Sequence, residues 1–275
     1  MNLYWKVQKW KMCKDCGCSG HHHDHSHEHH HVHAPGQPHT HVGPDGKIYT
    51  HAHDDAAVRE VAIGSAVLAA NDTAAAANRQ WFQERDVLVF NLISSPGAGK
   101  TTLLAETLKR LAALNIPAAV IVGDQYGSID ARRMQVTGAP VTQIETRSSC
   151  HLDASRVRAV LEQAVPEGTK ILFIENVGNL VCPVAFDLGE AEKIALLSTP
   201  EGEEKPLKYP ALFAAAKLVL LTKCDLSEVL EWNMAQCVEN IKQVNPDAQF
   251  MRISSKNMEG FESWISFLLK KLQKN

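Results

Sequence analysis

The chain is 275 residues long, with 21% charged residues and a formal net charge of −3 when histidine is neutral. Its lysines and arginines are spread along the sequence rather than gathered in a patch, so we expect neither a nucleic-acid partner nor a membrane partner. The longest apolar run, residues 61–70, is too short to span a bilayer, and residues 1–12 lack the apolar stretch of a signal peptide, which favours a cytoplasmic location.

The first 55 residues are rich in metal-ligating side chains. Thirteen of the 14 histidines lie between residues 21 and 53, and three cysteines stand before them in a C-x-x-C-x-C pattern. Large apolar residues are scarce here, so we expect residues 19–54 to be disordered unless metal is bound. Thiolates and neutral imidazoles suit Ni²⁺ or Zn²⁺. The predicted ligands of this extension are Cys13, Cys16, Cys18, His21, His22, His23, His25, His27, His29, His30, His31 and His33.

Residues 56–85 are rich in alanine and contain no proline, which predicts one or two helices leading into the body of the protein. From residue 86 to residue 275, apolar runs alternate with helical patterns, which predicts an α/β domain with a mostly parallel sheet and helices on both faces. The expected strands are residues 87–94, 118–122, 141–145, 170–175, 193–198, 217–222 and 248–254. The expected helices are residues 100–114, 153–165 and 260–272. The predicted organisation is a metal-binding extension (1–55), a helical leader (56–85) and one nucleotide-binding domain (86–275).

The stretch "SSPGAGKTT", residues 94–102, follows the first predicted strand and opens the first predicted helix. It matches the P-loop pattern G-x-x-x-x-G-K-[ST], except that Ser94 replaces the first glycine. Lys100 is expected to neutralise the charge of the β- and γ-phosphates, and Thr101 is expected to bind Mg²⁺. The motif predicts a P-loop NTPase. The expected nucleotide-binding residues are Ser95, Gly97, Ala98, Gly99, Lys100, Thr101 and Thr102.

Two strand ends predict that the base is guanine. "TKCD", residues 222–225, ends one buried strand, and "SSK", residues 254–256, ends the next one. A carboxylate at the first position can accept hydrogen bonds from both N1–H and N2–H₂ of guanine, and adenine offers no such pair of donors. We therefore expect GTP and GDP as ligands. The expected contacts are Thr222, Lys223, Asp225, Ser254, Ser255 and Lys256.

Carboxylates at two further strand ends are candidates for Mg²⁺ and for the attacking water. Glu175 opens "ENVG", which is similar to the D-x-x-G switch segment of GTPases, and Asp124 ends the "VIVGD" strand. For Asp130, a little further on, a helix cap or surface charge is as good an interpretation as a functional one. The predicted catalytic residues are Lys100, Asp124, Asp130 and Glu175, with Thr101, Asp124 and Glu175 on Mg²⁺. Slow turnover is expected, because no arginine finger or water-positioning glutamine is recognisable.

The body of the chain carries a second group of metal-ligating residues. Cys150 and His151 are adjacent at a predicted strand-to-helix turn, and Cys182 lies in the loop behind the switch segment. Two thiolates and one imidazole suit Ni²⁺ or Zn²⁺, and three ligands leave a coordination position that a second copy of the chain could complete. Cys224 and Cys237 are interpreted instead as small buried apolar residues.

From about Asn71 to the C-terminus, the sequence resembles the hydrogenase nickel-incorporation GTPases of the HypB family. The resemblance rests on "NRQWFQERDVLVFNLISSPGAGKTTLL", "GDQYGSIDARRMQ", "SSCHLDA", "IENVGNLVCPVAFDLGE" and "EGEEKPLKYP". It implies a GTPase that forms a homodimer when GTP is bound and that, with an accessory nickel metallochaperone, helps deliver nickel to the [NiFe]-hydrogenase large subunit. It also implies an interfacial metal site on Cys150, His151 and Cys182, and a Lys208 that reaches the partner's nucleotide.

The resemblance also bears on the N-terminal extension. Some family members begin with Met followed directly by C-x-x-C-G-C, and here Met12 directly precedes "CKDCGC". We therefore expect translation to begin at Met12, the cysteines to form a selective nickel site and the histidine tract to store nickel. Two other functions stay open. One is a urease-type nickel-insertion GTPase, which "ENVGNLVCP" disfavours, and the other is a nickel or zinc storage protein with a regulatory nucleotide fold.

Overall fold

The computed structural model describes the backbone of residues 38–42, 48–52, 56–125 and 129–274, and within these ranges the side chains from residue 65 onward except residue 129. The chain consists of two compact units, residues 1–69 and residues 70–275. The predicted metal ligands between residues 13 and 33, and the expected start at Met12, lie outside the described residues. Among the helices that the structure describes, none is both long and apolar enough to cross a membrane.

Within the first unit, two short strands pair antiparallel: β1 (Pro38–Val42) and β2 (Ile48–Ala52), with Thr40 opposite Thr50. This pair differs from the disorder expected for residues 19–54. Threonine, valine, isoleucine and tyrosine are interleaved with histidine in these strands, and β-branched and aromatic residues favour extended backbone. The expectation of disorder rests on the average composition of residues 19–54, which does not reflect this local preference.

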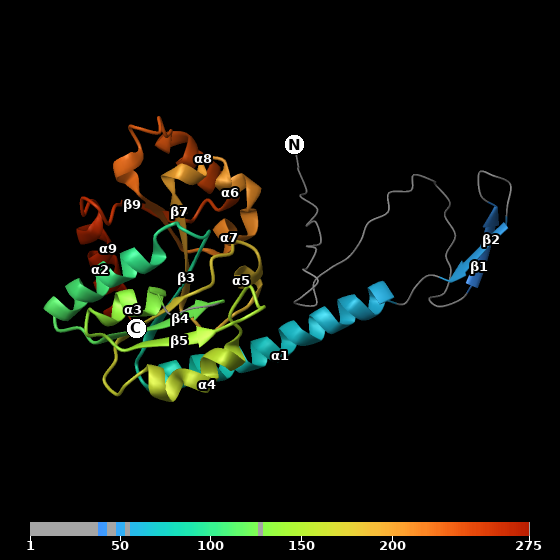
Figure 1. Cartoon of the computed structure of the whole chain (residues 1–275), viewed down its shortest axis with the longest axis horizontal. Helices are drawn as coiled ribbons and strands as arrows, with labels where there is room; N and C mark the ends of the chain where they lie inside the picture. The colour runs from blue at the N-terminus through green and yellow to red at the C-terminus, as the bar shows by residue number, and fades with distance from the viewer. Residues whose placement is uncertain (1–37, 43–47, 53–55, 126–128, 275) are drawn as a thin grey trace. The chain divides into compact units, whose positions relative to one another are not determined.

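The second unit is built on one sheet of seven parallel strands in the order β5-β4-β6-β3-β7-β8-β9 (Figure 1). Its inner strands are almost fully buried, as apolar strands covered on both faces should be. The predicted α/β fold class with a parallel sheet is confirmed. The strands are β3 (Leu88–Ser94), β4 (Ala118–Asp124), β5 (Val141–Glu145), β6 (Ile171–Glu175), β7 (Glu192–Ser198), β8 (Leu218–Thr222) and β9 (Gln249–Ile253).

The three helices predicted in the α/β domain each lie within one residue of their expected bounds, and the predicted leader is one continuous helix. In the described part of this domain, five further helices are not among the expected elements. Four of them are seven residues or shorter and show no full amphipathic period. The fifth, Met234–Val244, has 11 residues, so length does not explain its omission. The helices are α1 (Ala56–Glu84), α2 (Lys100–Ala113), α3 (Ile129–Gln135), α4 (Ala154–Ala164), α5 (Cys182–Ala185), α6 (Lys205–Lys208), α7 (Pro210–Ala215), α8 (Met234–Val244) and α9 (Phe261–Leu272), with 3₁₀ turns η2 (Thr199–Glu201) and η3 (Cys224–Leu226).

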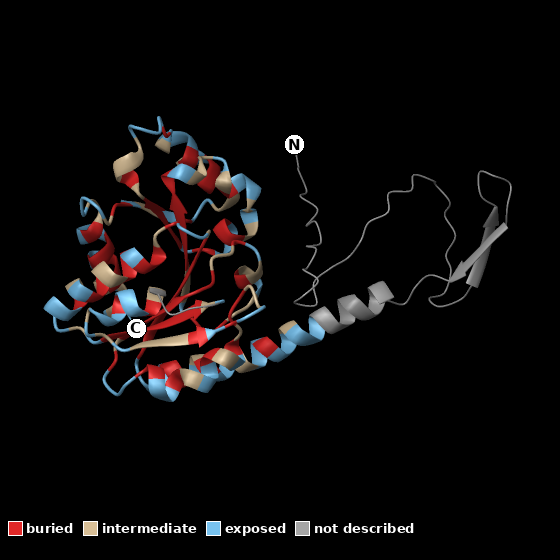
Figure 2. Ribbon diagram, in the orientation of Figure 1, coloured by how far each residue is buried: buried red, intermediate tan, exposed pale blue. Residues whose placement is uncertain are grey.

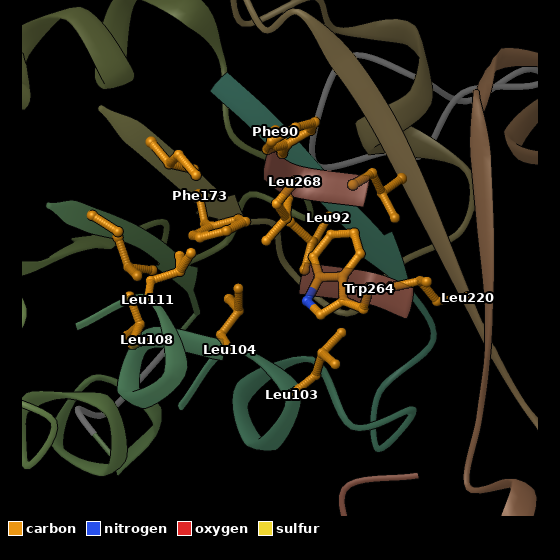
Figure 3. Packing of buried hydrophobic residues seen from close by; sticks show 14 of the residues in the cluster. Phe90, Leu92, Leu103, Leu104, Leu108, Leu111, Phe173, Leu220, Trp264 and Leu268 are labelled. Atoms are coloured by element: carbon orange, nitrogen blue, oxygen red, sulfur yellow. The ribbon is translucent and has the colours of Figure 1, made fainter. Parts of the chain in front are cut away.

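Helices cover both faces of the sheet. On one face, α2, α3 and α9 pack over Phe90 and Leu92 of β3, and Trp264 of α9 is fully buried among them (Figures 2 and 3). On the other face, α1 and α4 pack over Val89, and α7 and α8 belong to the cluster around Ile93. Because successive side chains of a strand point to opposite faces, β3 contributes to both cores.

The topology gathers functional residues at one edge of the sheet. β3 lies between β6 and β7, and the chain leaving β3 crosses over β6 to reach β4. All seven strands run in the same direction, so the segments that follow them lie at the same carboxyl-terminal edge. Ligands of parallel α/β sheets bind at this edge, where the strand order changes direction.

Candidate functional site

The P-loop joins β3 to α2 at the carboxyl-terminal edge of the sheet. Gly97 (φ 75°) and Gly99 (φ 100°) have left-handed backbone, which glycine adopts without strain, and α2 begins directly after them at Lys100. The first turn of α2 therefore directs backbone N–H groups and the positive end of the helix dipole toward the loop. This arrangement binds phosphate groups.

Lys100 lies buried beneath this loop. Its Nζ donates a 2.8 Å hydrogen bond to Ser94 Oγ, and Ser94 Oγ in turn donates to Ser95 O. Burial lowers the pKa of Lys100, while the negative charge of Glu175 acts in the opposite direction. Ser94 thus positions the lysine from the place where the P-loop pattern has glycine.

Glu175 ends β6 and faces the first turn of α2. Thr101 Oγ1 donates a 2.7 Å hydrogen bond to Glu175 Oε1, whereas Glu175 Oε2 is buried and has no hydrogen-bond partner among the residues that the structure describes. Burial raises the pKa of Glu175 to about 7, although Lys100 and Thr101 act to lower it. A buried carboxylate oxygen beside a threonine hydroxyl fits Mg²⁺, which prefers oxygen ligands.

Asp124 and Asp130 lie near the same group. Both are half-buried, and both interact electrostatically with Lys100 and Glu175. Asp130 stands in the first turn of α3, where its Oδ1 lies 3.9 Å from Arg133 Nη1. The four side chains predicted to be catalytic therefore lie in one electrostatic cluster.

The predicted base-binding residues also converge. Thr222 Oγ1 donates a 2.7 Å hydrogen bond to Ala98 O of the P-loop, so the end of β8 is tied directly to the phosphate loop. Ser254 Oγ donates a 2.6 Å hydrogen bond to Asp225 Oδ1, which joins the ends of β8 and β9. Lys223 between them has left-handed backbone (φ 58°).

Three further contacts complete this turn. Lys256 is exposed, with its Nζ 4.0 Å from Asp225 Oδ2, and its backbone N–H donates to Ser254 Oγ. Thr199 Oγ1 donates a 3.0 Å hydrogen bond to the carbonyl oxygen of Lys223, a contact that no sequence motif signals. Of the other residues expected at the nucleotide, Ser255 is half-buried in the turn and Thr102 is exposed on the first turn of α2.

The two thiols and one imidazole predicted as metal ligands in the body lie together. The potential ligand atoms of Cys150, His151 and Cys182 all lie within 4.8 Å of one another, and Cys150 Sγ lies 3.8 Å from His151 Nδ1. Cys150 and His151 belong to the loop between β5 and α4, and Cys182 is the first residue of α5, the element that follows β6 along the chain. Such a set of donors suits Ni²⁺ or Zn²⁺.

His151 is held by an aromatic ring. It stacks on Phe186 with the ring centroids 3.8 Å apart and the planes at 23°. Burial lowers the pKa of His151 and so favours the neutral imidazole, which is the form that binds metal. Phe186 is not among the predicted site residues, since nothing in its sequence context indicates the stacking.

Residues that are not among the predicted site residues link the two sites. Asn176, directly after Glu175, is 1% exposed, and its Oδ1 accepts a 3.3 Å hydrogen bond from Leu152 N, directly after His151. Gly123, directly before Asp124, lies against the Leu152 side chain. Asn176 takes the second position of "ENVG", which the switch pattern leaves unspecified, so the motif does not indicate its role.

Lys208 lies apart from these contacts. It ends the short helix α6, is exposed, and its Nζ is 2.9 Å from Glu204 Oε2. The hydrogen bond and the charge of Glu204 raise the pKa of Lys208, so the side chain stays positively charged.

Known proteins have similar sequences and a similar fold. The CobW/HypB/UreG nucleotide-binding domain matches residues 88–252. The hydrogenase maturation factors HypB of Azotobacter chroococcum and Escherichia coli K12 are each 47% identical to the chain over 223 residues, covering 81% of this chain and 73% and 77% of theirs. The crystal structure of HypB from Helicobacter pylori in complex with nickel matches with a TM-score of 0.71 and 37% identity, covering 74% of this chain and 96% of that one. On this sequence similarity and shared fold, the chain belongs to the HypB hydrogenase maturation factors.

Proposed function

We propose that this protein is a GTP-hydrolysing nickel metallochaperone that stores nickel and assists its insertion into the [NiFe]-hydrogenase large subunit. One observation carries the proposal. The segment between β6 and α5 begins with Glu175, which contacts Thr101 at the nucleotide site, and ends seven residues later with Cys182, which belongs to the metal-ligand group. A change at the nucleotide therefore has a short covalent path to a metal ligand.

The P-loop and the base turn would hold GTP. Backbone N–H groups of residues 95–102 and the Lys100 ammonium would bind the phosphates, and the Asp225 carboxylate would accept the two guanine donors. Ser254 orients Asp225 through its 2.6 Å hydrogen bond. Thr222 acts mainly as a positioning residue, because its hydroxyl already bonds Ala98 O.

Hydrolysis would take place beside the buried carboxylates. Thr101 and Glu175, together with Asp124, would hold Mg²⁺, which when bound neutralises phosphate charge. Asp124 or Asp130 would orient the attacking water, since both lie within electrostatic reach of Lys100. Turnover by the isolated protein would be slow, because no arginine finger or water-positioning glutamine is recognisable in the sequence.

Nickel would be the cargo of the second site. Cys150, His151 and Cys182 would hold Ni²⁺, and Zn²⁺ suits the same ligands. The cysteines and histidines of residues 1–55 would supply further nickel, with residues 56–85 as a leader and residues 86–275 as the GTPase domain. The partners would be an accessory nickel metallochaperone and the hydrogenase large subunit.

A homodimer that forms with GTP would complete the nickel coordination. Lys208 is suited to reach a partner's nucleotide, because it is exposed and its exposed ion pair with Glu204 is a weak contact to give up. Replacing Lys208 by Ala would then reduce dimer formation with a GTP analogue, without a loss of monomer stability.

The proposal is tested by nickel transfer to purified hydrogenase large-subunit precursor, with GTP, with GDP and with the Lys100→Ala variant. We expect transfer with GTP that exceeds transfer with GDP and that the variant loses. Equal transfer in all three cases would show that the nucleotide does not control transfer, and would favour a nickel storage protein. Transfer to urease apoprotein in place of the hydrogenase precursor would indicate the urease-type function.

A further inference from the structure

Leu152 occupies a central position between the metal site and the nucleotide site. It is fully buried and directly follows His151. Its backbone N–H donates to Asn176 Oδ1 at 3.3 Å, and its side chain packs so closely on Gly123 that a Cβ there would lie 2.7 Å from Leu152 Cγ and Cδ1. Leu152 is therefore held both through its backbone and through its side chain.

Both contacts lie one residue from a carboxylate of the nucleotide site. Asn176 directly follows Glu175 at the end of β6, and Gly123 directly precedes Asp124 at the end of β4. β4 and β6 are neighbouring strands. A movement of either strand end therefore acts on Leu152, since a close-packed interior transmits displacement instead of absorbing it.

Asn176 is held firmly enough to transmit such a movement. Its Oδ1 also accepts a 3.0 Å hydrogen bond from Val177 N, and its Nδ2 donates to Asn91 Oδ1 at 3.2 Å. Asn91 Nδ2 donates in turn to Glu190 Oε1, which lies 2.8 Å from Lys193 Nζ. The backbone N–H groups of Leu152 and Val177 both point at one atom of the Asn176 amide, so this atom must be the oxygen. The Asn176 Nδ2 group therefore points to Asn91 Oδ1, which fixes the orientation of the Asn91 amide as well.

The loop that carries Cys182 has its own contact with the nucleotide site. A Cβ on Gly178 would lie 2.9 Å from Pro96 Cγ and 3.0 Å from Pro96 Cα in the P-loop. The segment following Glu175 therefore touches the P-loop on one side, through Gly178, and the His151 loop on the other, through Asn176. The positions of His151 and Cys182 therefore both depend on the backbone of residues 176–178.

We propose that Leu152 and Asn176 form the joint through which the bound nucleotide sets the position of His151 relative to Cys182. The inference rests on the proposed function, because it assigns a path to coupling between nucleotide and nickel. Asn176 is a positioning residue that contacts neither ligand itself. By linkage, the joint also transmits the effect of nickel on nucleotide affinity.

The test uses the full-length chain with Cys13, Cys16 and Cys18 replaced by serine, so that the thiolate-to-nickel absorption band reports Cys150 and Cys182. Free Ni²⁺ is set with a chelator buffer, which prevents the histidine tract from changing the free-ion concentration. Nickel affinity is measured with GDP and with a non-hydrolysable GTP analogue. The ratio of the two affinities is the coupling. A variant that weakens nickel binding equally in both nucleotide states leaves this ratio unchanged.

In this parent we expect a coupling of at least about fivefold, as is usual for linked sites. Asn176→Ala should reduce it to less than about twofold, because Leu152 N loses its acceptor. Asn245→Ala is the matched control: its Nδ2 bonds the carbonyls of Phe213, Ala214 and Ala216, near the amino-terminal edge of the sheet. This control should keep the coupling of the parent.

Full coupling in folded Asn176→Ala would overturn the joint. If that variant does not fold, Asn176→Ser serves instead, because its hydroxyl is polar but too short to reach Leu152 N, and full coupling in it has the same meaning. Failure of the proposed function looks different, since the parent itself would then bind no GTP analogue, show no thiolate band or have equal nickel affinity in both states.

Discussion

Thr101 Oγ1 donates a 2.7 Å hydrogen bond to Glu175 Oε1, joining the first turn of α2 to the end of β6. The other carboxylate oxygen is buried with no hydrogen-bond partner in the described part of the chain. Burying a carboxylate in this way disfavours its charged form, and the pKa of Glu175 is raised to about 7. Keeping Glu175 charged therefore costs the folded protein stability.

Replacing Glu175 by Gln should stabilise the nucleotide-free protein at pH 8 and change it little at pH 5. The folded pKa lies above the unfolded value, so the parent loses stability as the pH rises from about 4.5 through about 7, and glutamine does not titrate. We expect a gain of about 2 kcal/mol at pH 8, after allowing for the weaker interaction with Lys100. Urea unfolding at both pH values measures it, and a variant less stable than the parent at pH 8 would contradict the account.

Thr222→Val should weaken GTP binding by roughly tenfold. The valine keeps the shape of the side chain but leaves the Ala98 carbonyl without its donor, which loosens the contact between P-loop and base turn. Thr137→Val is the control, since Thr137 Oγ1 makes a similar 2.7 Å hydrogen bond to Met134 O after α3. Equal GTP affinity of the two variants, measured by calorimetry, would show that the tie to the P-loop is unimportant.

Asp225→Ala should lower the affinity for GTP by at least about a hundredfold and leave the affinity for ATP unchanged. The loss follows from removing a charged acceptor of two hydrogen bonds, each of which is worth about 1.5–3 kcal/mol. Competition with a fluorescent nucleotide measures both affinities. A parallel decrease for ATP would mean that the substitution damages the phosphate site instead of base recognition.

Cys182→Ala should abolish the effect of nickel on GTP binding and leave GTP binding itself intact. The residue lies in the metal-ligand group at the end of the segment that Glu175 begins. GTP affinity is measured with and without a fixed free Ni²⁺ concentration. Cys237→Ala is the control, because Cys237 lies on α8 and is buried in the hydrophobic core. Persistence of the nickel effect in Cys182→Ala would place the coupling elsewhere.

Gly123→Ala should lower nickel affinity at the body site by about fivefold with either nucleotide. The added Cβ would lie 2.7 Å from Leu152 Cγ, so the leucine and the neighbouring His151 must shift. Adding Leu152→Val, which shortens the side chain at that contact, should restore most of the affinity. If the double variant binds nickel no better than Gly123→Ala, steric pressure on Leu152 is not the cause.

Much of this fold could be predicted because its signals are local. The P-loop lies within nine consecutive residues between a strand and a helix, so the phosphate site follows from the sequence alone. The inner strands of the sheet are mostly apolar runs, which their length and the turns at their ends identify. Cys150 and His151 are neighbours in sequence, and the position of Cys182 shortly after the switch segment predicts its pairing with them.

Other features depend on contacts between distant residues. Leu152 and Asn176 are 24 residues apart, and only the adjacency of the β5–α4 loop to the end of β6 brings them together. The stacking of Phe186 on His151 likewise joins two loops. The β1–β2 pair was missed for a different reason: its ten residues differ from the average composition of the surrounding segment.

GTP hydrolysis is proposed to change how Cys150, His151 and Cys182 hold nickel. This change is tested most directly by mixing nickel-loaded full-length protein, with Cys13, Cys16 and Cys18 replaced by serine, with GTP and Mg²⁺ for a single turnover. Phosphate release and the thiolate-to-nickel band are followed together. We expect the band to change at the rate of phosphate release, and to stay constant with the non-hydrolysable analogue once binding is complete. A band that is unchanged throughout hydrolysis would contradict the proposal.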